Sequence, residues 1–196
     1  MKQPNIHRLL ELQKLLETFN RIERVTHRQH TQGFVPENDT EHSYNLAITA
    51  WFLAQHFPEL DSNLLIRLAL VHDLVEVHAG DTYVYADAAT IASKHQREAA
   101  ALKQLQADWS DFPELLVAIV FYEERSSNEA KFVYALDKIM PIMQIYNSEG
   151  YTWKKEGITP EQLDAIKREK VALSPQIKPY YDQLYELLIS NPQLFN

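Results

Sequence analysis

The chain contains no cysteine, so any bound metal has to be held by nitrogen and oxygen donors rather than by thiolates. Basic residues are also in the minority, because 19 lysines and arginines stand against 27 aspartates and glutamates, a formal net charge of −8. Such a surface repels phosphate backbones, and we expect no nucleic acid partner. Net charge does not describe a single pocket, so a small anionic substrate remains compatible with this composition.

Long hydrophobic runs are lacking as well. The first residues, MKQPNIHRLL, contain no apolar signal core, and no segment approaches the roughly 18 apolar residues that span a bilayer. We therefore expect no membrane association and a cytoplasmic location. With 4 glycines, 9 prolines and 45% hydrophobic residues, the chain has an ordinary globular composition rather than a disordered one. At 196 residues it is long enough for one domain with a substantial core, and we expect a single domain over residues 1–196.

Apolar residues recur at helical spacing through most of the chain. An amphipathic helix is expected over residues 6–22, followed by a loop over residues 26–38 that contains a glycine and a proline. Further helices are expected over residues 40–57, 61–78, 88–107, 113–124 and 128–147, with two more opened by Thr159-Pro160 and Ser174-Pro175. No segment shows sustained two-residue alternation. The predicted fold class is all-α, a compact helical bundle.

Polar residues before the apolar segments indicate where several helices begin. Asp39 or Thr40 is expected to cap the helix over residues 40–57, and Asp61 to cap the following one. Ser126 and Glu129 have the spacing of a capping box for the helix over residues 128–147.

Two potential metal ligands, His72 and Asp73, are adjacent in the run ALVHDLVEVHAGD, on a helix that is otherwise strongly apolar. A buried imidazole and carboxylate are costly unless they are paired, hydrogen-bonded or bound to a cation. His42, at the start of one central helix, and Asp137, in the middle of another, would supply ligands from facing helices. Such a set leaves open positions on an octahedral ion for a water nucleophile and a substrate oxygen. The pattern predicts a hydrolytic metal centre.

Further charged residues are candidates for roles beside this centre. Glu76 lies one helical turn beyond His72, so it could orient or deprotonate a water molecule, or protonate a leaving oxygen. Asp81, just past the end of the same helix, is a candidate at the rim of the site. A phosphate also needs cationic contacts, for which Arg21 and Arg24 near the end of the first helix are the candidates.

Each of these residues also has an ordinary structural interpretation when taken alone. His42 suits an exposed position at a helix start, and Asp137 suits a surface acid paired with Lys138. Glu76 suits a solvated helix face, and Arg21 suits an ion pair within its own helix. The shared site is favoured because all of the residues fit it together.

The combination of His42, His72-Asp73 and Asp137 resembles the motif of the HD-domain superfamily of metal-dependent phosphohydrolases, a His, a His-Asp pair and a distant Asp. The local context resembles the 5′-deoxynucleotidase branch of that superfamily in three segments, NDTEHSYNLAITAWFLA, LALVHDLVEVHAGD and RSSNEAKFVYALDKIMP. The resemblance covers roughly residues 20–146. It implies an HD-domain helical bundle with a metal site between central helices and the C-terminal helices packed on it.

The resemblance also implies roles for individual residues. The four motif residues would be the metal ligands, Glu76 and Asp81 active-site residues, and Arg21 the phosphate contact, because FNRIERV resembles a short Asn-Arg segment of the branch. The loop that follows is longer here, which leaves Arg24 and Arg28 as alternatives to Arg21. Family members typically form homodimers and use ions such as cobalt or manganese, and the donor types are also compatible with Fe, Ni, Zn or Mg.

Three functions are compatible with this sequence. The leading one is hydrolysis of a (deoxy)nucleoside 5′-monophosphate to nucleoside and phosphate, which makes a small phosphorylated substrate the expected partner. A second is another hydrolysis reaction of the HD-domain superfamily, with a cyclic nucleotide, a nucleoside triphosphate or an alarmone as substrate. The third is a non-catalytic helical module that keeps a metal for stability or binds partners. Glu76 and Asp81 argue against the third, since a structural site is usually closed by its ligands and has no use for flanking acids.

Overall fold

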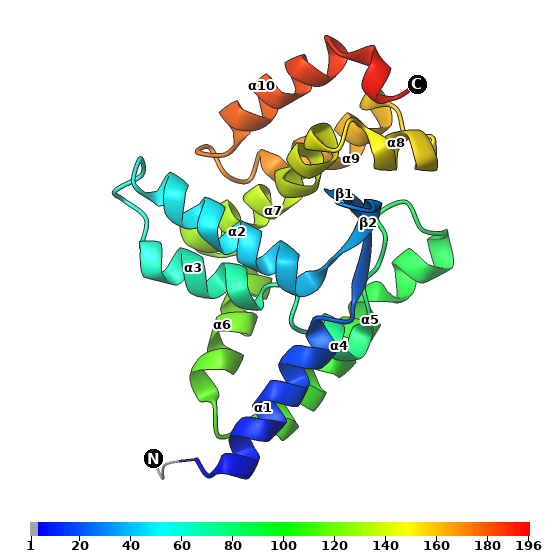
Figure 1. The fold of residues 1–196 in the computed structure, drawn as a ribbon. Coiled ribbons are helices and arrows are strands. Elements are labelled where there is room, and N and C mark those ends of the chain that lie inside the picture. Colours follow the sequence, from blue (N-terminus) through cyan, green and yellow to red (C-terminus); the bar gives the residue numbers. More distant parts are fainter. Residues whose placement is uncertain (1–3) are drawn as a thin grey trace.

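The computed structural model describes residues 4–196, which form helices and one two-stranded β-hairpin (Figure 1). The elements are α1 (Ile6–Phe19), β1 (Glu23–His30), β2 (Gly33–Asn38), α2 (Asp39–Ala54), α3 (Ser62–Val71), α4 (Glu76–Ala79), α5 (Ala88–Asp108), α6 (Pro113–Glu124), α7 (Asn128–Asn147), α8 (Tyr151–Glu156), α9 (Pro160–Val171), α10 (Lys178–Ile189) and the 3₁₀ turn η1 (Pro192–Leu194). The prediction of an all-α fold is confirmed. Among the helices of residues 4–196, none has both the length and the apolar character that a membrane crossing requires.

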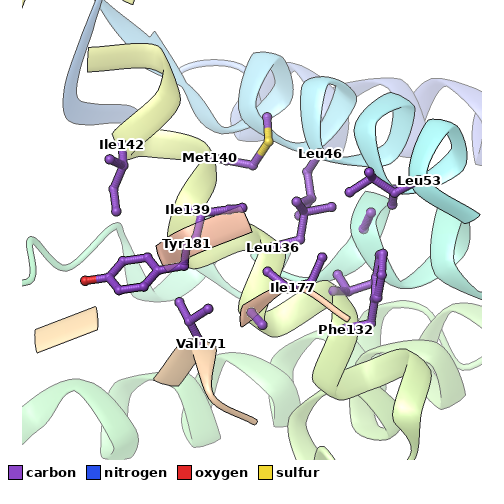
Figure 2. Close-up of a cluster of buried hydrophobic side chains, with 14 of the residues drawn as sticks. Leu46, Leu53, Phe132, Leu136, Ile139, Met140, Ile142, Val171, Ile177 and Tyr181 are labelled. Carbon is purple, nitrogen blue, oxygen red and sulfur yellow. The ribbon is translucent and has the colours of Figure 1, made fainter. Parts of the chain in front are cut away.

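Helix α7 lies at the centre of the larger hydrophobic core. It packs against α2, α3, α6, α9, α10 and strand β1. Figure 2 shows side chains of α7 meeting those of α2, α9 and α10, and the labelled residues are Leu46, Leu53, Phe132, Leu136, Ile139, Met140, Ile142, Val171, Ile177 and Tyr181. Helix α7 is apolar around most of its circumference, and Asp137 in the middle of this helix is buried.

A second hydrophobic cluster joins α1, α4, α5 and α6 at the N-terminal end of the molecule (Figure 1). The chain passes from the first cluster to the second between Ala69, which belongs to the larger core, and Leu74, which belongs to the smaller one. The His72-Asp73 pair lies on this crossing. The two cores therefore fix the pair from both sides.

The prediction of a loop over residues 26–38 is wrong, because these residues form most of the β-hairpin. Strands β1 and β2 pair antiparallel, with His30 opposite Gly33, whose φ of 112° favours glycine in the turn. The only fully buried side chains of the two strands are polar, His27 and Glu37. The hairpin therefore lacks the alternation of apolar and polar residues that predicts a strand.

Contacts with α8 hold the hairpin in place, and α8 was not predicted either. The backbone N–H of His27 donates to Thr152 Oγ1 at 2.9 Å, and Phe34 stacks on Tyr151 with ring centroids 4.2 Å apart. The last long helix also begins later than predicted, at Lys178 rather than after Ser174-Pro175.

The helix predicted over residues 61–78 is interrupted after α3. Asp61 caps α3 as predicted, accepting from the backbone N–H groups of Asn63 and Leu64. Residues 72–75 then form turns, in which the backbone N–H of Leu74 bonds to Val71 and that of Glu76 to Asp73, three residues back rather than four. This tighter winding differs from the α-helical pattern and places the His72-Asp73 pair at a helix end.

Two predicted caps are displaced by a residue or two. Asn38, not Asp39 or Thr40, caps α2, and it forms a capping box with Glu41. Ser127, not Ser126, caps α7. Asp39 is unsuited to capping because its buried carboxylate is turned to an internal ion pair, described below.

Replacing Phe132 by alanine tests the central role of α7. Phe132 is fully buried and its ring packs edge-on against Phe57 at 5.9 Å. We expect Phe132→Ala to lower the free energy of unfolding by about 3–5 kcal/mol, through lost transfer energy and the remaining cavity. Urea denaturation followed by circular dichroism measures this, with the exposed Val117→Ala as control. A loss below about 1 kcal/mol would contradict the described packing.

Candidate metal centre

The structure brings together the four residues predicted as metal ligands. His42 comes from the first turn of α2, His72 and Asp73 from the turns after α3, and Asp137 from the middle of α7. One nitrogen or oxygen atom of each lies within 4.8 Å of those of the others. His42 Nε2 is 2.9 Å and His72 Nε2 3.7 Å from the same oxygen, Asp137 Oδ1.

Both imidazole rings are oriented by a contact on their far side. His72 Nδ1 donates to the carbonyl oxygen of Ala69 at 2.8 Å, so Nε2 is the ring nitrogen that faces the site. His42 Nδ1 lies 3.4 Å from Glu37 Oε2, which leaves His42 Nε2 facing Asp137. Histidines that bind metals commonly donate their other ring nitrogen to a carbonyl or carboxylate in this way.

Buried polar atoms without hydrogen-bond partners supply a test of whether a cation fits here. Within residues 4–196, these atoms include His72 Nε2, Asp39 Oδ2 and Glu76 Oε2. Each is a lone-pair donor whose burial is costly unless it is satisfied. Asp39, Asp73 and Glu76 also form a second group whose oxygens approach one another closely enough to hold an ion. The side chains therefore fit a divalent metal held by nitrogen and oxygen.

Arg24, from strand β1, carries the positive charge that the acidic residues require. Its Nη1 donates to Asp73 Oδ2 at 2.8 Å and to Asp39 Oδ1 at 3.0 Å, and its Nε lies 3.8 Å from Glu37 Oε2. Burial alone would disfavour the guanidinium charge, but the carboxylates of Asp73 and Asp137 hold its pKa well above the ordinary value. The positive charge of Arg24 is therefore largely neutralised by the carboxylates that surround it.

The His72-Asp73 pair has strongly shifted pKa values. Burial disfavours the charged form of both, yet their mutual attraction outweighs it. The pKa of His72 rises to about 10 because of the nearby Asp73 and Asp137 carboxylates, and the pKa of Asp73 falls well below its usual range because of His72 and Arg24. Burial likewise acts against the Asp137 carboxylate, but Lys138 and the imidazoles lower its pKa.

Glu76 and Asp81 have the opposite shift. Glu76 begins α4 and is buried, and its burial together with the charges of Asp73 and Asp81 raises its pKa to about 11. Burial also raises the pKa of Asp81. A cation among these carboxylates would lower both pKa values again, so both groups are suited to exchanging a proton at the site.

A cavity of about 530 Å³ is lined by two of the four ligands, Asp73 and Asp137. Its wall includes the acidic residues Asp73, Glu76, Asp81, Asp137 and Glu169. The basic residues of the wall are Arg24, Lys94, Lys138, Lys167 and Lys170, and its apolar or aromatic residues include Tyr83, Tyr85, Ile91, Pro141, Trp153 and Ile166. A volume of this size is typical of pockets for small molecules. The cavity thus combines charged groups of both signs with an aromatic surface.

The structure does not bring Arg21 to this cavity. Arg21 follows the end of α1, its side chain is 76% exposed, and its guanidinium lies 3.8 Å from Glu17. Strand β1 begins two residues later and leads inward, so Arg24 lines the cavity instead. Arg28 pairs with Glu41 at 2.9 and 2.5 Å.

Several residues of the site were not predicted. Glu37 lies in the segment predicted as a loop, and Asp39 was expected only to cap the helix that follows, so neither was expected to be buried. Lys167 and Lys170 lie on α9, outside the motif segments, and no local signal distinguishes them from surface lysines. Only the three-dimensional packing of α9 against α7 brings them to the cavity.

Replacing Arg24 tests whether it compensates the buried acids. Arg24→Gln leaves Asp39 and Asp73 without their cationic partner, so we expect the free energy of unfolding to fall by about 3–5 kcal/mol. Arg21→Gln, the matched control, should change it by less than about 0.5 kcal/mol because its ion pair is exposed. Chemical denaturation measures both, and equal effects of the two variants would refute the assignment.

Comparison with known proteins places this geometry in a family. The HD domain family matches residues 17–178. Among relatives, the 5′-deoxynucleotidase HDDC2 of Bos taurus is 39% identical over 114 residues, which cover 56% of this chain and 53% of the bovine protein. The match thus spans about half the length of that relative. HDDC2 of Xenopus laevis is 34% identical over 146 residues, which cover 72% of this chain and 69% of the frog protein.

Solved structures agree with the fold. The crystal structure of a predicted metal-dependent phosphohydrolase from Magnetospirillum magnetotacticum superimposes with a TM-score of 0.79, is 28% identical, and is matched over 96% of both chains. The family match covers most of the chain, and the frog relative is matched over more than two thirds of both proteins. The chain belongs to the HD domain family.

Proposed function

We propose that this chain is a metal-dependent phosphohydrolase that converts (deoxy)nucleoside 5′-monophosphates to nucleoside and phosphate. The observation that carries the proposal is the convergence of four nitrogen and oxygen ligands within 4.8 Å of one another, two of which, Asp73 and Asp137, line a cavity of about 530 Å³. The relatives that are described as 5′-deoxynucleotidases support the choice of substrate.

The metal ligands in this proposal are His42, His72, Asp73 and Asp137. A divalent ion bound there would act as a Lewis acid on the phosphoryl group and would make a water molecule a better nucleophile. The far-side contacts of the two imidazoles support this assignment, since they direct both Nε2 atoms to the site. Manganese and cobalt are the first ions to test, and Fe, Ni, Zn and Mg are compatible with the same donors.

Glu76 and Asp81 are the proposed proton-transfer residues. The Oε2 atom of Glu76 is buried without a hydrogen-bond partner, and both carboxyl groups line the cavity beside Asp73. Glu76 is suited to accept a proton from the attacking water, and Asp81 to give one to the leaving nucleoside oxygen. Arg24 would hold Asp73 in position from behind, since its Nη1 binds Asp73 Oδ2.

Aromatic residues in the cavity support a nucleotide rather than a smaller phosphate ester. Tyr83 and Tyr85 lie between α4 and α5, with ring centroids 5.4 Å apart, and both line the cavity together with Trp153. Such rings offer a planar base a stacking surface that a small alkyl phosphate cannot use.

Phosphate release from a panel of ribo- and deoxyribonucleoside 5′-monophosphates tests the proposal. With manganese or cobalt we expect release that EDTA abolishes and that Asp73→Ala removes, because the ligand set is then broken. Glu76→Gln should bind the metal but lower kcat by about 10²–10⁴-fold, the usual contribution of a general acid or base.

The exposed Glu114→Gln in α6 is the matched control and should keep wild-type turnover. Full turnover by Glu76→Gln would overturn its assigned role. No release from any monophosphate would overturn the choice of substrate. Nucleoside triphosphates, cyclic nucleotides and alarmones would then be the next compounds to test.

We also propose a homodimer that uses the outer face of α2. This face exposes four large side chains, Tyr44, Ile48, Trp51 and Phe52, the last two being 55% and 61% exposed. Contiguous apolar surface of this kind is typical of a protein contact. The wild type should have the mass of a dimer in sedimentation equilibrium, and Trp51→Glu with Phe52→Glu that of a folded monomer. A monomeric wild type would contradict the proposal.

A further inference from the structure

The proposed reaction requires cations that meet the phosphate, and the arginines near the site are already neutralised. Arg24 is bound by Asp39 and Asp73, and Arg28 by Glu41. The acidic residues at the metal centre repel a phosphate dianion unless positive charge offsets them. The phosphate therefore needs other cationic partners in the cavity wall.

Four lysines line the cavity from three helices, Lys94 from α5, Lys138 from α7, and Lys167 and Lys170 from α9. Lys138 is paired with Asp137, and Lys94 lies 3.3 Å from Glu98. Within residues 4–196, neither Lys167 nor Lys170 has a carboxylate within ion-pair distance. Because they are three residues apart on a helix, both side chains lie on the same face of α9.

Placing these lysines together is electrostatically unfavourable. Burial, followed by repulsion from Lys138, lowers the pKa of Lys167 to about 7. Burial and repulsion from Lys138 and Lys94 also lower the pKa of Lys170. Glu169 of the same helix also lines the cavity but forms no ion pair with either lysine. Crowded, partly desolvated ammonium groups outside ion pairs are stabilised when an anion enters, because the anion favours their charged form.

The Asp137-Lys138 dipeptide links this cluster to the metal centre. Asp137 faces the two imidazoles, whereas the next residue of α7 lines the cavity beside the α9 lysines. Helix α9 packs directly on α7, which fixes the distance between the metal ligands and the lysines. An anion bound to the lysines would thus lie next to the metal ligands.

We propose that Lys167 and Lys170, beside the Asp137-paired Lys138, form an anion subsite that binds the phosphoryl group of the substrate and, after hydrolysis, inorganic phosphate. The role in turnover rests on the proposed phosphohydrolase function, while anion binding itself does not. In this arrangement α9 supplies the phosphate contacts that the arginines of β1 do not supply.

Calorimetric titration of inorganic phosphate into the manganese-loaded protein tests the subsite. We expect Lys167→Met and Lys170→Met each to raise the Kd for phosphate by about tenfold, since each removes one charge-assisted contact. Lys167→Arg, which keeps the charge, should stay within about threefold of the wild type. Lys103→Met, an exposed lysine of α5 that does not line the cavity, is the control and should leave the Kd unchanged.

The Kd for manganese and the unfolding midpoint of each variant separate anion binding from metal binding and folding. We expect both values to match those of the wild type. Wild-type phosphate affinity in the Lys167→Met/Lys170→Met double variant would overturn the proposal. Failure of the wild type to bind phosphate would also overturn it.

Kinetics distinguishes this proposal from the proposed function. Nucleotide hydrolysis with an unchanged KM in the double variant would refute the subsite and leave the phosphohydrolase standing. Lysine-dependent phosphate binding without hydrolysis of any nucleoside monophosphate would refute the substrate and leave the subsite standing.

Discussion

Negative charge buried between helices is the constraint on which the rest of the structure depends. Glu37, Asp39, Asp73 and Asp137 approach one another inside the protein, where each uncompensated carboxylate would cost several kcal/mol. Arg24 offsets part of this charge, and the β-hairpin can be understood as the element that carries both Arg24 and Glu37 inward. The imidazoles and a divalent ion at the proposed centre would offset the remainder. Fold and site are therefore linked, because the packing that buries the acids also creates the need for a cation.

The cavity separates charges in a way that suits a phosphate ester. Its acidic side is built on α7 and the turns after α3, where the proposed ion and the proton-transfer groups lie. Its basic side is built largely on α9, where Lys167 and Lys170 lack acidic partners among the described residues. Aromatic residues between α4 and α5, including Tyr83 and Tyr85, complete the wall. A nucleotide matches these surfaces, because its dianionic phosphate suits the basic side and its planar, weakly polar base suits the aromatic residues.

Helical periodicity was sufficient to predict the fold class, because it is a local signal. Which four residues lie together was predicted from the costly His-Asp pair on an apolar helix and from the resemblance to the HD motif. The hairpin could not be predicted in that way, because its buried residues are polar and it is held by tertiary contacts with α2, α7 and α8. Arg24 rather than Arg21 lies at the cavity for a similar reason, since a helix followed by a loop gives no indication of which arginine turns inward. Lys167 and Lys170 are brought to the site by tertiary packing alone.

The central claim is that His42, His72, Asp73 and Asp137 hold one divalent ion. Anomalous diffraction from crystals of the manganese-loaded protein tests this most directly. We expect one strong peak per chain at about 2.0–2.3 Å from His42 Nε2, His72 Nε2 and one oxygen of each aspartate. A peak bound by other residues, or no peak at saturating manganese, would contradict the account, because the buried acids would then be compensated in another way.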